Sequence, residues 1–339
     1  MLRALLWPAS FVFEGLVVLR ARLYEQGVLR QRRLSGRVIS VGNLTVGGTG
    51  KTPMVLWLVE RLLAEGRRVA ILTRGYGGAE PPEAHGALPS DEVALLRARL
   101  GAKVQFGIGA DRYARGRMLE RHGVEWFVLD DGFQHVQLAR DVDIVLVDAT
   151  DPFGGGHVLP VGRLREPRSA LARADVVVIT RSEHAPAIET VIRRHTEAPI
   201  FYAQTHLRAL LTLVANPEQP ELAANHWREL KFFAFCGIGN PEAFFDDLRR
   251  WGMNLVGTAA YRDHYRYSQR DAEELERRAE AAGADALLTT EKDVFNLRQA
   301  RFKARPAYYC QIALAISDEE SFWRAVLDVA ERNRTRAAS

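Results

Sequence analysis

The residues Val38–Thr52, with the sequence Val-Ile-Ser-Val-Gly-Asn-Leu-Thr-Val-Gly-Gly-Thr-Gly-Lys-Thr, decide the fold of this chain. Their first part, Val38–Val41, is an apolar run typical of a buried strand, and a glycine-rich loop follows it. The next residues, Pro53–Ala64, predict a helix. Glycines let backbone N–H groups turn inward around phosphate oxygens, and the N-terminus of the following helix attracts negative charge. The stretch therefore predicts a phosphate-binding loop between a strand and a helix.

The end of this loop has the residue types that bind a nucleoside triphosphate. A lysine in this place, here Lys51, reaches the β- and γ-phosphates, and the hydroxyl after it, here Thr52, binds Mg²⁺. The strict pattern G-x-x-x-x-G-K-[ST] has glycine where this chain has Thr45, and the later glycines supply the backbone freedom instead. A simple turn is the alternative, and the flanking strand and helix disfavour it. We expect the nucleotide to contact Thr45, Gly47, Gly48, Thr49, Gly50, Lys51 and Thr52.

A second apolar run, Val124–Leu129, ends in two carboxylates, Asp130 and Asp131. In P-loop enzymes a carboxylate at a strand end holds Mg²⁺ directly or through water. We therefore predict that Thr52, Asp130 and Asp131 bind the metal. A turn or helix-capping role is the alternative for the two aspartates, and Asp148, which ends another apolar run, is a weaker metal candidate.

Short β-rich runs alternate with helical stretches along the rest of the chain. The runs are apolar without strict alternation, which is typical of a mainly parallel sheet covered by helices on both faces. We predict an α/β fold, a P-loop-type α/β/α sandwich with a smaller second α/β domain. The expected boundaries are 1–28 for an N-terminal membrane-associated helix, 29–205 for the nucleotide-binding domain and 206–335 for the smaller domain.

The composition excludes several classes of protein. With 339 residues, 47% hydrophobic and 26% charged, the chain is not collagen-like, a coiled coil or disordered. Its two cysteines, Cys236 and Cys310, lie far apart and form no C-x-x-C or Cys/His ligand spacing. A disulfide scaffold and a structural zinc site are therefore disfavoured, and a reducing compartment is expected.

The N-terminus combines apolar and basic residues. Residues 1–40 contain seven arginines and two glutamates, whereas the whole chain has a formal charge of +4, so the remainder is close to neutral. Leu2–Leu19 is mostly apolar, but Pro8 and Glu14 interrupt it, and a spanning helix needs about 20 apolar residues. We predict a helix lying in the membrane interface, with arginines reaching lipid phosphates. A helix packed on the protein's own core is the alternative, whereas Glu14 disfavours a signal peptide.

A phosphate-binding loop and an acidic strand end do not distinguish a kinase from a GTPase or an ATPase. The residues Thr289–Asp293 lie where a guanine-reading N-K-x-D element would follow a strand, but Glu291 stands where that element has asparagine. Guanine specificity is therefore disfavoured. A P-loop GTPase or metallochaperone that switches with its nucleotide, and a membrane-tethered scaffold with a vestigial nucleotide site, stay open as alternatives.

The chain resembles a known family, the tetraacyldisaccharide 4'-kinases of lipid A biosynthesis. Seven motifs carry the resemblance in order over nearly the whole chain, and together with the apolar, basic N-terminus they are specific: Val41–Thr52, Thr73–Gly78, Asp111–Tyr113, Asp130–His135, Leu159–Pro167, Asp263–His264 and Thr290–Asp293.

The resemblance implies an activity and its setting. It implies phosphorylation of the 4'-hydroxyl of a tetraacyl disaccharide 1-phosphate, with ATP as donor and Mg²⁺ as cofactor. The enzyme would associate peripherally, in a monotopic manner, with the cytoplasmic face of the inner membrane, and no obligate protein partner is implied. Nucleic acid is not expected as a partner, because the basic residues gather at the N-terminus rather than over a folded face with aromatic residues between them. Two α/β/α domains would hold the active site in the cleft between them.

The resemblance also implies catalytic residues. The family's catalytic aspartate lies in a Gly-Asp-Glu-Pro motif, which matches Asp91 in Ser90-Asp-Glu-Val93, although both flanking residues differ. The family's partner histidine follows an aromatic-x-Asp pattern, which matches His264. Asp91 would accept the proton of the sugar hydroxyl, supported by His264, with Lys51 on the phosphates. From the residues alone, Asp91 would be a helix N-cap.

Several further residues lie in the same motifs. Arg165 and Glu166 lie in Leu-Arg-Glu-Pro and are expected to contact the nucleotide, and a salt-bridged loop is their alternative role. The roles of Arg74, His135 and Asp293 stay open.

Overall fold

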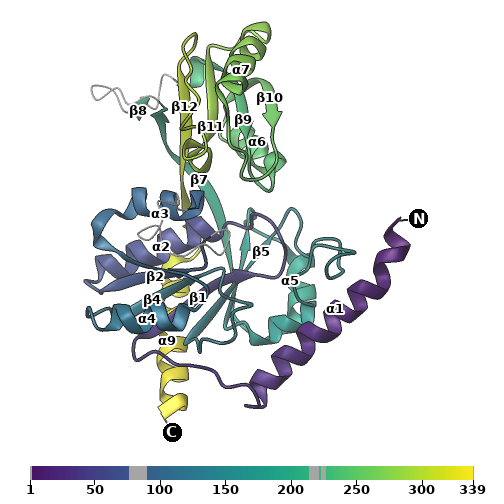
Figure 1. The fold of residues 1–339 in the computed structure, drawn as a ribbon, viewed down its shortest axis with the longest axis vertical. Coiled ribbons are helices and arrows are strands. Elements are labelled where there is room, and N and C mark those ends of the chain that lie inside the picture. The colour runs from purple at the N-terminus through teal and green to yellow at the C-terminus, as the bar shows by residue number, and fades with distance from the viewer. Residues whose placement is uncertain (1, 76–89, 214–220, 223–226, 339) are drawn as a thin grey trace. The chain divides into compact units, whose positions relative to one another are not determined.

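The computed structural model describes residues 2–75, 90–213, 221–222 and 227–338 (Figure 1). The chain divides into two compact units. Unit 1 comprises Met1–Pro89, Leu100–Gln204 and Leu314–Ser339, and unit 2 comprises Ser90–Arg99 and Thr205–Ala313. The chain therefore passes into unit 2 twice and ends in unit 1. This division differs from the expected boundaries at two places, because Ser90–Arg99 belongs to unit 2 and the C-terminal helix belongs to unit 1.

Unit 1 is built on a parallel sheet. Its strands are β1 (Arg37–Asn43), β2 (Val69–Thr73), β3 (Gln105–Ile108), β4 (Trp126–Asp130), β5 (Val142–Asp148), β6 (Val176–Thr180) and the first part of β7 (Ile200–Thr212), which continues into unit 2 from Thr205. Their order is β7-β6-β5-β1-β4-β2-β3, and each neighbouring pair is parallel. All residues of β2, β4, β5 and β6 are buried, so both faces of these strands are covered. The predicted mainly parallel α/β sheet is confirmed.

The α-helices of unit 1 are α1 (Leu2–Glu25), α2 (Lys51–Ala64), α4 (Arg112–Glu120), α5 (Pro186–Arg193) and α9 (Glu319–Ala338). In unit 1, α2 contacts β1, β2 and β4, α4 contacts β2 and β3, and α9 contacts β5 (Figure 1). The short helix α5 and the first half of β7 were not predicted from the sequence.

The strand order reverses at β1. The chain adds β2, β3 and β4 on one side of β1, and β5, β6 and β7 on the other. Ligands of open parallel sheets bind where this order reverses, at the carboxyl ends of the strands. The register pairs Val41 of β1 with Asp130 of β4, so the loop after β1 and the acidic end of β4 meet at this edge.

Unit 2 contains four neighbouring parallel strands. Its strands β9 (Lys231–Cys236), β10 (Asn254–Ala260), β11 (Ala286–Thr290) and β12 (Ala307–Ile316) lie in the order β10-β9-β11-β12, and the short β8 (Glu221–Leu222) pairs with β7. Its helices are α3 (Asp91–Leu100), α6 (Pro241–Arg250), α7 (Gln269–Ala281) and α8 (Glu291–Val294). Buried aromatic side chains, among them Phe232, Phe235, Phe245 and Tyr267, fill its core.

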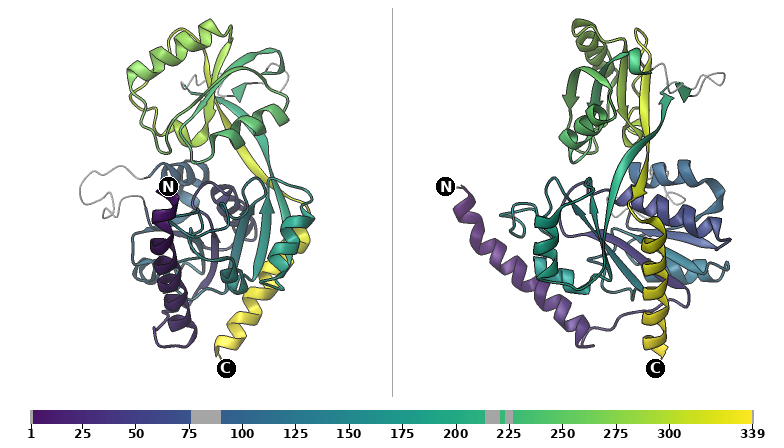
Figure 2. Two further views of the ribbon diagram at one scale, coloured as in Figure 1. Left: turned by 90° about the vertical axis from the view of Figure 1, so that its right-hand side faces the viewer. Right: turned by 180° about the vertical axis from the view of Figure 1, so that it is seen from behind.

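Helix α1 packs on unit 1 along one side only (Figure 2). Ser10 is buried and its hydroxyl donates to the Val158 carbonyl over 2.8 Å, and Phe13 packs against the core beside α5. A row of apolar residues on α1 stays exposed, and the exposed fractions of Phe11, Val12, Leu16 and Leu19 are 54–65%. Among the described residues, no helix combines the length and apolarity that crossing a bilayer requires.

Candidate nucleotide and acid–base sites

The loop after β1 is held by its own asparagine. Asn43 ends β1, and its amide nitrogen donates to the Thr45 carbonyl over 2.8 Å, while its amide oxygen accepts from Nζ of Lys51 over 3.2 Å. Thr45, which replaces the first glycine of the strict pattern, is buried. Asn43 therefore fixes both the start of the loop and the lysine at its end.

Two glycines make the tight turn of this loop. Gly47 has φ of 128° and Gly50 has φ of 85°, and Gly50 directly precedes α2. Only glycine adopts such angles readily, so the backbone turns here without strain. The Thr49 carbonyl accepts from the Thr180 hydroxyl at the end of β6 over 3.2 Å. The loop is thus tied to the sheet and leaves the N-terminus of α2 to face a ligand.

The two aspartates at the end of β4, Asp130 and Asp131, have different partners. Oδ2 of Asp130 accepts from the Thr73 hydroxyl over 3.4 Å. Asp131 has a left-handed backbone with φ of 50°, and Nη1 of Arg165 lies 2.8 and 2.7 Å from its two carboxylate oxygens. Nζ of Lys51 lies 3.5 Å from Oδ1 of Asp131. Burial would raise the pKa of Asp131, but the charges of Lys51 and Arg165 outweigh it and lower this pKa.

Arg165 and Glu166 point to different partners. The Arg165 backbone N–H donates to the Leu44 carbonyl over 2.7 Å, so this residue lies beside the phosphate loop. Glu166 is buried, and both of its carboxylate oxygens accept from Arg173, over 3.0 and 2.8 Å. The ion pair between Glu166 and Arg173 matches the alternative role, a salt-bridged loop. Contact of Arg165 or Glu166 with a nucleotide stays a prediction.

His135 is a neutral side chain in a basic neighbourhood. Nη1 of Arg112 lies 2.9 Å from its Nδ1, and because a guanidinium only donates, Nδ1 accepts. Burial and the charges of Arg112, Arg140 and Arg20 lower the pKa of His135 to about 4. His135 therefore carries no charge near neutral pH.

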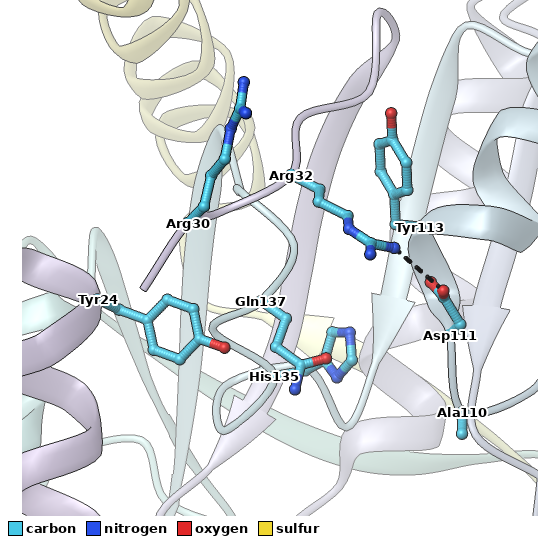
Figure 3. A pocket seen from close by; sticks show the side chains of 8 residues that line it. All are labelled: Tyr24, Arg30, Arg32, Ala110, Asp111, Tyr113, His135 and Gln137. Carbon is cyan, nitrogen blue, oxygen red and sulfur yellow. Dashed lines mark hydrogen bonds and ion pairs between the residues drawn. The ribbon is translucent and has the colours of Figure 1, made fainter. Parts of the chain in front are cut away.

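A cavity of about 450 Å³ opens beside His135, near the end of α1 (Figure 3). Figure 3 shows Arg32 reaching Asp111, a contact of 3.2 Å. A smaller cavity of about 260 Å³ has α1 as one wall. Its lining mixes apolar, polar and charged side chains: Phe13, Val17 and Ala21 of α1, Val136, Leu159, the arginines Arg20 and Arg165, Gln134 and Glu166.

Unit 2 contains an aspartate–histidine pair. The Val93 N–H donates to the Ser90 hydroxyl over 3.4 Å, so Ser90 caps α3 and the N-cap interpretation of Asp91 is wrong. Asp91 begins α3 with its side chain only 4% exposed. Nδ1 of His264 lies 2.8 and 3.0 Å from its two carboxylate oxygens. A carboxylate accepts, so Nδ1 carries a proton, and the other ring nitrogen, Nε2, lies 3.7 Å from Oδ2 of Asp263.

The charges around this pair favour its ionised form. Burial would raise the pKa of Asp91, but the hydrogen bond from His264 and the charge of Lys292 outweigh it and lower this pKa. The same hydrogen bond raises the pKa of His264 above its ordinary value. His264 also has a left-handed backbone, with φ of 57°, which is uncommon for a residue with a side chain and is found at functional sites.

The sequence did not reveal three further contacts. Asn43 orients Lys51, and both Lys292 and Asn296 lie against Asp91. Lys292 lies inside the motif Thr290–Asp293, but its partner lies about two hundred residues earlier, and no local pattern links the two.

Asp293, whose role the sequence left open, is a buried structural residue. It accepts from the Gly237 N–H and the Tyr267 hydroxyl, each over 2.9 Å, and from the Thr290 hydroxyl over 2.6 Å. Arg74 is exposed. Residues 76–78 of the motif that begins at Thr73 lie outside the described residues.

The strand, the glycine-rich loop, the helix and the acidic strand end define unit 1 as a P-loop nucleotide-binding protein of the α/β class. A family model described as tetraacyldisaccharide-1-P 4'-kinase, or LpxK, matches residues 2–331. The chain belongs to this family.

Individual relatives agree with this assignment. The chain is 39% identical over 336 residues to the tetraacyldisaccharide 4'-kinase of Geobacter metallireducens, which covers 95% of this chain and 97% of that protein. It is 42% identical over 308 residues to the tetraacyldisaccharide 4'-kinase of Geobacter sulfurreducens, and this match covers 87% of this chain and 84% of that protein. The crystal structure of LpxK from Aquifex aeolicus in complex with ATP matches with a TM-score of 0.74 and 31% identity, covering 97% of this chain and 99% of that chain.

Proposed function

We propose that this protein transfers the γ-phosphoryl group of ATP to the 4'-hydroxyl of a tetraacyl disaccharide 1-phosphate in lipid A biosynthesis. The observation that carries the proposal is the Asp91–His264 pair, because a nucleotide switch has no need of a buried acid–base pair. Membership of the tetraacyldisaccharide 4'-kinase family supports the donor and the acceptor, and LpxK of Aquifex aeolicus has been crystallised with ATP.

The phosphate loop holds the donor in this proposal. Backbone N–H groups of Gly47–Thr52 surround the phosphates, and Lys51 neutralises charge that develops on the transferred group. Asp131 holds Lys51 and Arg165 through ion pairs, so both cations are already oriented near the loop. Thr45 supports the loop from its buried position.

The donor set near Lys51 fits magnesium. Thr52, Asp130 and Asp131 offer only hydroxyl and carboxylate oxygens, which are the ligands that Mg²⁺ prefers. Because Asp131 pairs with two cations, we propose Asp130 and Thr52 as the main protein ligands, with Asp131 acting through water. When bound, Mg²⁺ would stabilise negative charge on the phosphate oxygens.

Asp91 supplies the base in this proposal. A sugar hydroxyl is a weak nucleophile near neutral pH, so its proton must leave as the new P–O bond forms. The lowered pKa of Asp91 keeps this carboxylate ionised and able to accept a proton. His264 orients the carboxylate through Nδ1.

The exposed apolar residues of α1 suit an enzyme whose acceptor is a membrane lipid. The exposed row Phe11, Val12, Leu16 and Leu19 suits the apolar region of a bilayer, and we propose peripheral, monotopic attachment to the cytoplasmic face of the inner membrane. The smaller cavity beside α1 offers apolar walls together with Arg20 and Arg165, which suits an acylated phosphate lipid.

Consumption of ATP with and without a detergent-dispersed acylated disaccharide phosphate tests the proposal. A kinase consumes ATP only with the acceptor and places radiolabel from its γ-phosphate on the lipid. Hydrolysis without acceptor, stimulated by a protein, would instead indicate the P-loop GTPase or metallochaperone alternative. Nucleotide binding without any turnover would indicate a scaffold with a vestigial site.

A further inference from the structure

The Asp91 carboxylate has more partners than His264 alone. Oδ2 of Asp91 also accepts from Nδ2 of Asn296 over 3.2 Å, and Nζ of Lys292 lies 3.8 Å from the same oxygen. Oδ1 accepts from the backbone N–H of Glu92 over 3.0 Å. Donors thus approach both oxygens from the segment after β11 and from α3 itself, in addition to the imidazole.

Lys292 is shared among three carboxylates. Its Nζ lies 3.6 Å from Glu92, 3.5 Å from Asp263 and 3.8 Å from Asp91. Its side chain is only 19% exposed, and the surrounding carboxylates outweigh its burial and raise the pKa of Lys292, so it stays protonated. The charged groups that face Asp91 are therefore Lys292 and His264 as cations, with Glu92 and Asp263 as anions.

Lys292 and Asn296 are held on a rigid turn. They lie four residues apart across α8 and the turn that follows it, and residues at this spacing share one face of a helix. Between them, Asp293 is buried and accepts from Gly237, Tyr267 and Thr290. The hydrogen bonds of Asp293 therefore fix the position from which both side chains reach Asp91.

A second charged contact holds the C-terminal end of α3. Nη1 of Arg99 lies 3.1 Å from Glu291, the residue before Lys292, and both side chains are nearly buried. Neighbouring residues of the Thr290–Asp293 motif thus contact the two ends of α3.

We propose that Lys292 and Asn296 are positioning residues that hold Asp91 as an oriented anion facing His264. The inference rests on the proposed role of Asp91 as the base. Neither residue touches the substrate in this proposal. Each acts by stabilising the charged carboxylate and by restricting its rotation, so removal of either changes the range of pH over which Asp91 accepts a proton.

Asn296→Asp is the sharpest test, because it keeps the shape of the side chain and places a negative charge beside Asp91. Gln299→Glu is its matched control, because it adds the same charge at an exposed position of the same segment. Two measurements are needed on the full chain. One is a ¹³C NMR titration of the Asp91 carboxyl carbon, assigned by its loss in Asp91→Asn. The other is the pH profile of kcat/KM with detergent-dispersed acceptor.

In Asn296→Asp we expect the Asp91 titration and the acid limb of kcat/KM to move together to higher pH. Turnover at the acid end should fall by about tenfold, as loss of one charged hydrogen bond implies. Lys292→Met should act in the same direction, and Lys292→Arg should restore the wild-type profile. Gln299→Glu should leave both measurements unchanged.

An unchanged Asp91 titration in Asn296→Asp and Lys292→Met would overturn the proposal, as would an equal shift in Gln299→Glu. The positioning role of Lys292 and Asn296 can hold even where the role of Asp91 as the base does not. If the titration moves while Asp91→Asn still turns over normally, the positioning stands and the assignment of Asp91 as base fails.

Discussion

Nδ1 of His264 lies 2.8 Å from Oδ2 of Asp91, although 173 residues separate the two side chains along the chain. Both residues belong to unit 2, to which α3 is added from an earlier part of the sequence. The pair therefore forms within one compact body, and its geometry does not depend on the other unit.

Asp91→Asn should abolish most of the activity. The amide cannot accept the hydroxyl proton, and general base catalysis contributes about a thousandfold, so kcat should fall by about that factor. Transfer of radiolabel from ATP to the acceptor measures this. Binding of ATP, followed by calorimetry, should be unchanged because the phosphate loop is intact. Ordinary turnover in this variant would remove Asp91 from the mechanism.

His264→Gln should change how stability depends on pH. The ordinary pKa of Asp91 is 3.8, and the fold lowers it. The stabilisation that Asp91 contributes to the folded state is therefore fully present above pH 3.8 and is lost as the pH falls through the lowered pKa. The ordinary pKa of His264 is 6.5 and is raised, so its share is complete below 6.5 and is lost as pH rises through the raised value.

The Tm difference between the wild type and His264→Gln should therefore be largest at about pH 5, between these two values, and smaller at about pH 9. Thermal denaturation at both pH values measures it. A Tm difference that is the same at both would show that the imidazole stabilises unit 2 by packing rather than by its charge.

Lys51→Ala should lower kcat by about a hundredfold to a thousandfold, because it removes a charge that acts mainly on the transition state. The fold should persist, since Lys51 is tied to the loop through its contacts with Asn43 and Asp131 at the sheet edge rather than through the core. Circular dichroism checks the fold and single-turnover kinetics check the chemistry. Lys103→Ala, at an exposed lysine of the same unit, is the control and should behave as the wild type.

Phe11→Glu combined with Leu16→Glu should release the protein from lipid vesicles. Both residues are more than 60% exposed, so the substitutions spare the contacts of Ser10 and Phe13 with the body. Met118→Glu, which charges an exposed apolar residue of α4, is the matched control. Flotation with vesicles measures the binding.

Deletion of residues 1–26 should have the same effect on flotation, whereas high salt should weaken vesicle binding only in part, since apolar burial does not depend on salt. Continued flotation of the charged variant and of the deletion would assign α1 to the body of the protein alone.

Gly42→Ala should destabilise unit 1. A Cβ at this position of β1 would lie 2.5 Å from Cβ of Phe133 and 2.7 Å from its backbone nitrogen, so the backbone after β4 must shift. Overpacking of this kind costs about 2 kcal/mol, measurable by urea denaturation. Gly48→Ala meets no atom within 4 Å and is the control. Equal stability of the two variants would contradict the close approach.

The parts of the fold predicted correctly from sequence are those fixed by local pattern. Val38–Thr52 contains a buried strand, a loop that needs glycine and a helix start within one short stretch, and each part reinforces the others. The acidic end of β4 was predictable for the same reason, because a strand that ends in Asp130 places it at the edge where β1 ends.

The contacts of the acid–base site could not be predicted from local pattern. The sequence around Asp91 is typical of a helix cap, but Ser90 occupies that position, and only the resemblance to a family pointed to the role of Asp91. Asn296 contacts Asp91 across 205 residues of sequence, so no spacing rule reaches it. The neutral state of His135 likewise depends on arginines brought together by the fold.

The double passage of the chain through unit 2 also constrains recombination between relatives. A chimaera that exchanges only residues 205–313 would combine His264 and Lys292 from one parent with Asp91 from the other, because Ser90–Arg99 would stay behind. Crossover designs for this family must therefore transplant that short helical segment together with the later one, or each hybrid will carry an acid and an imidazole that were never selected together.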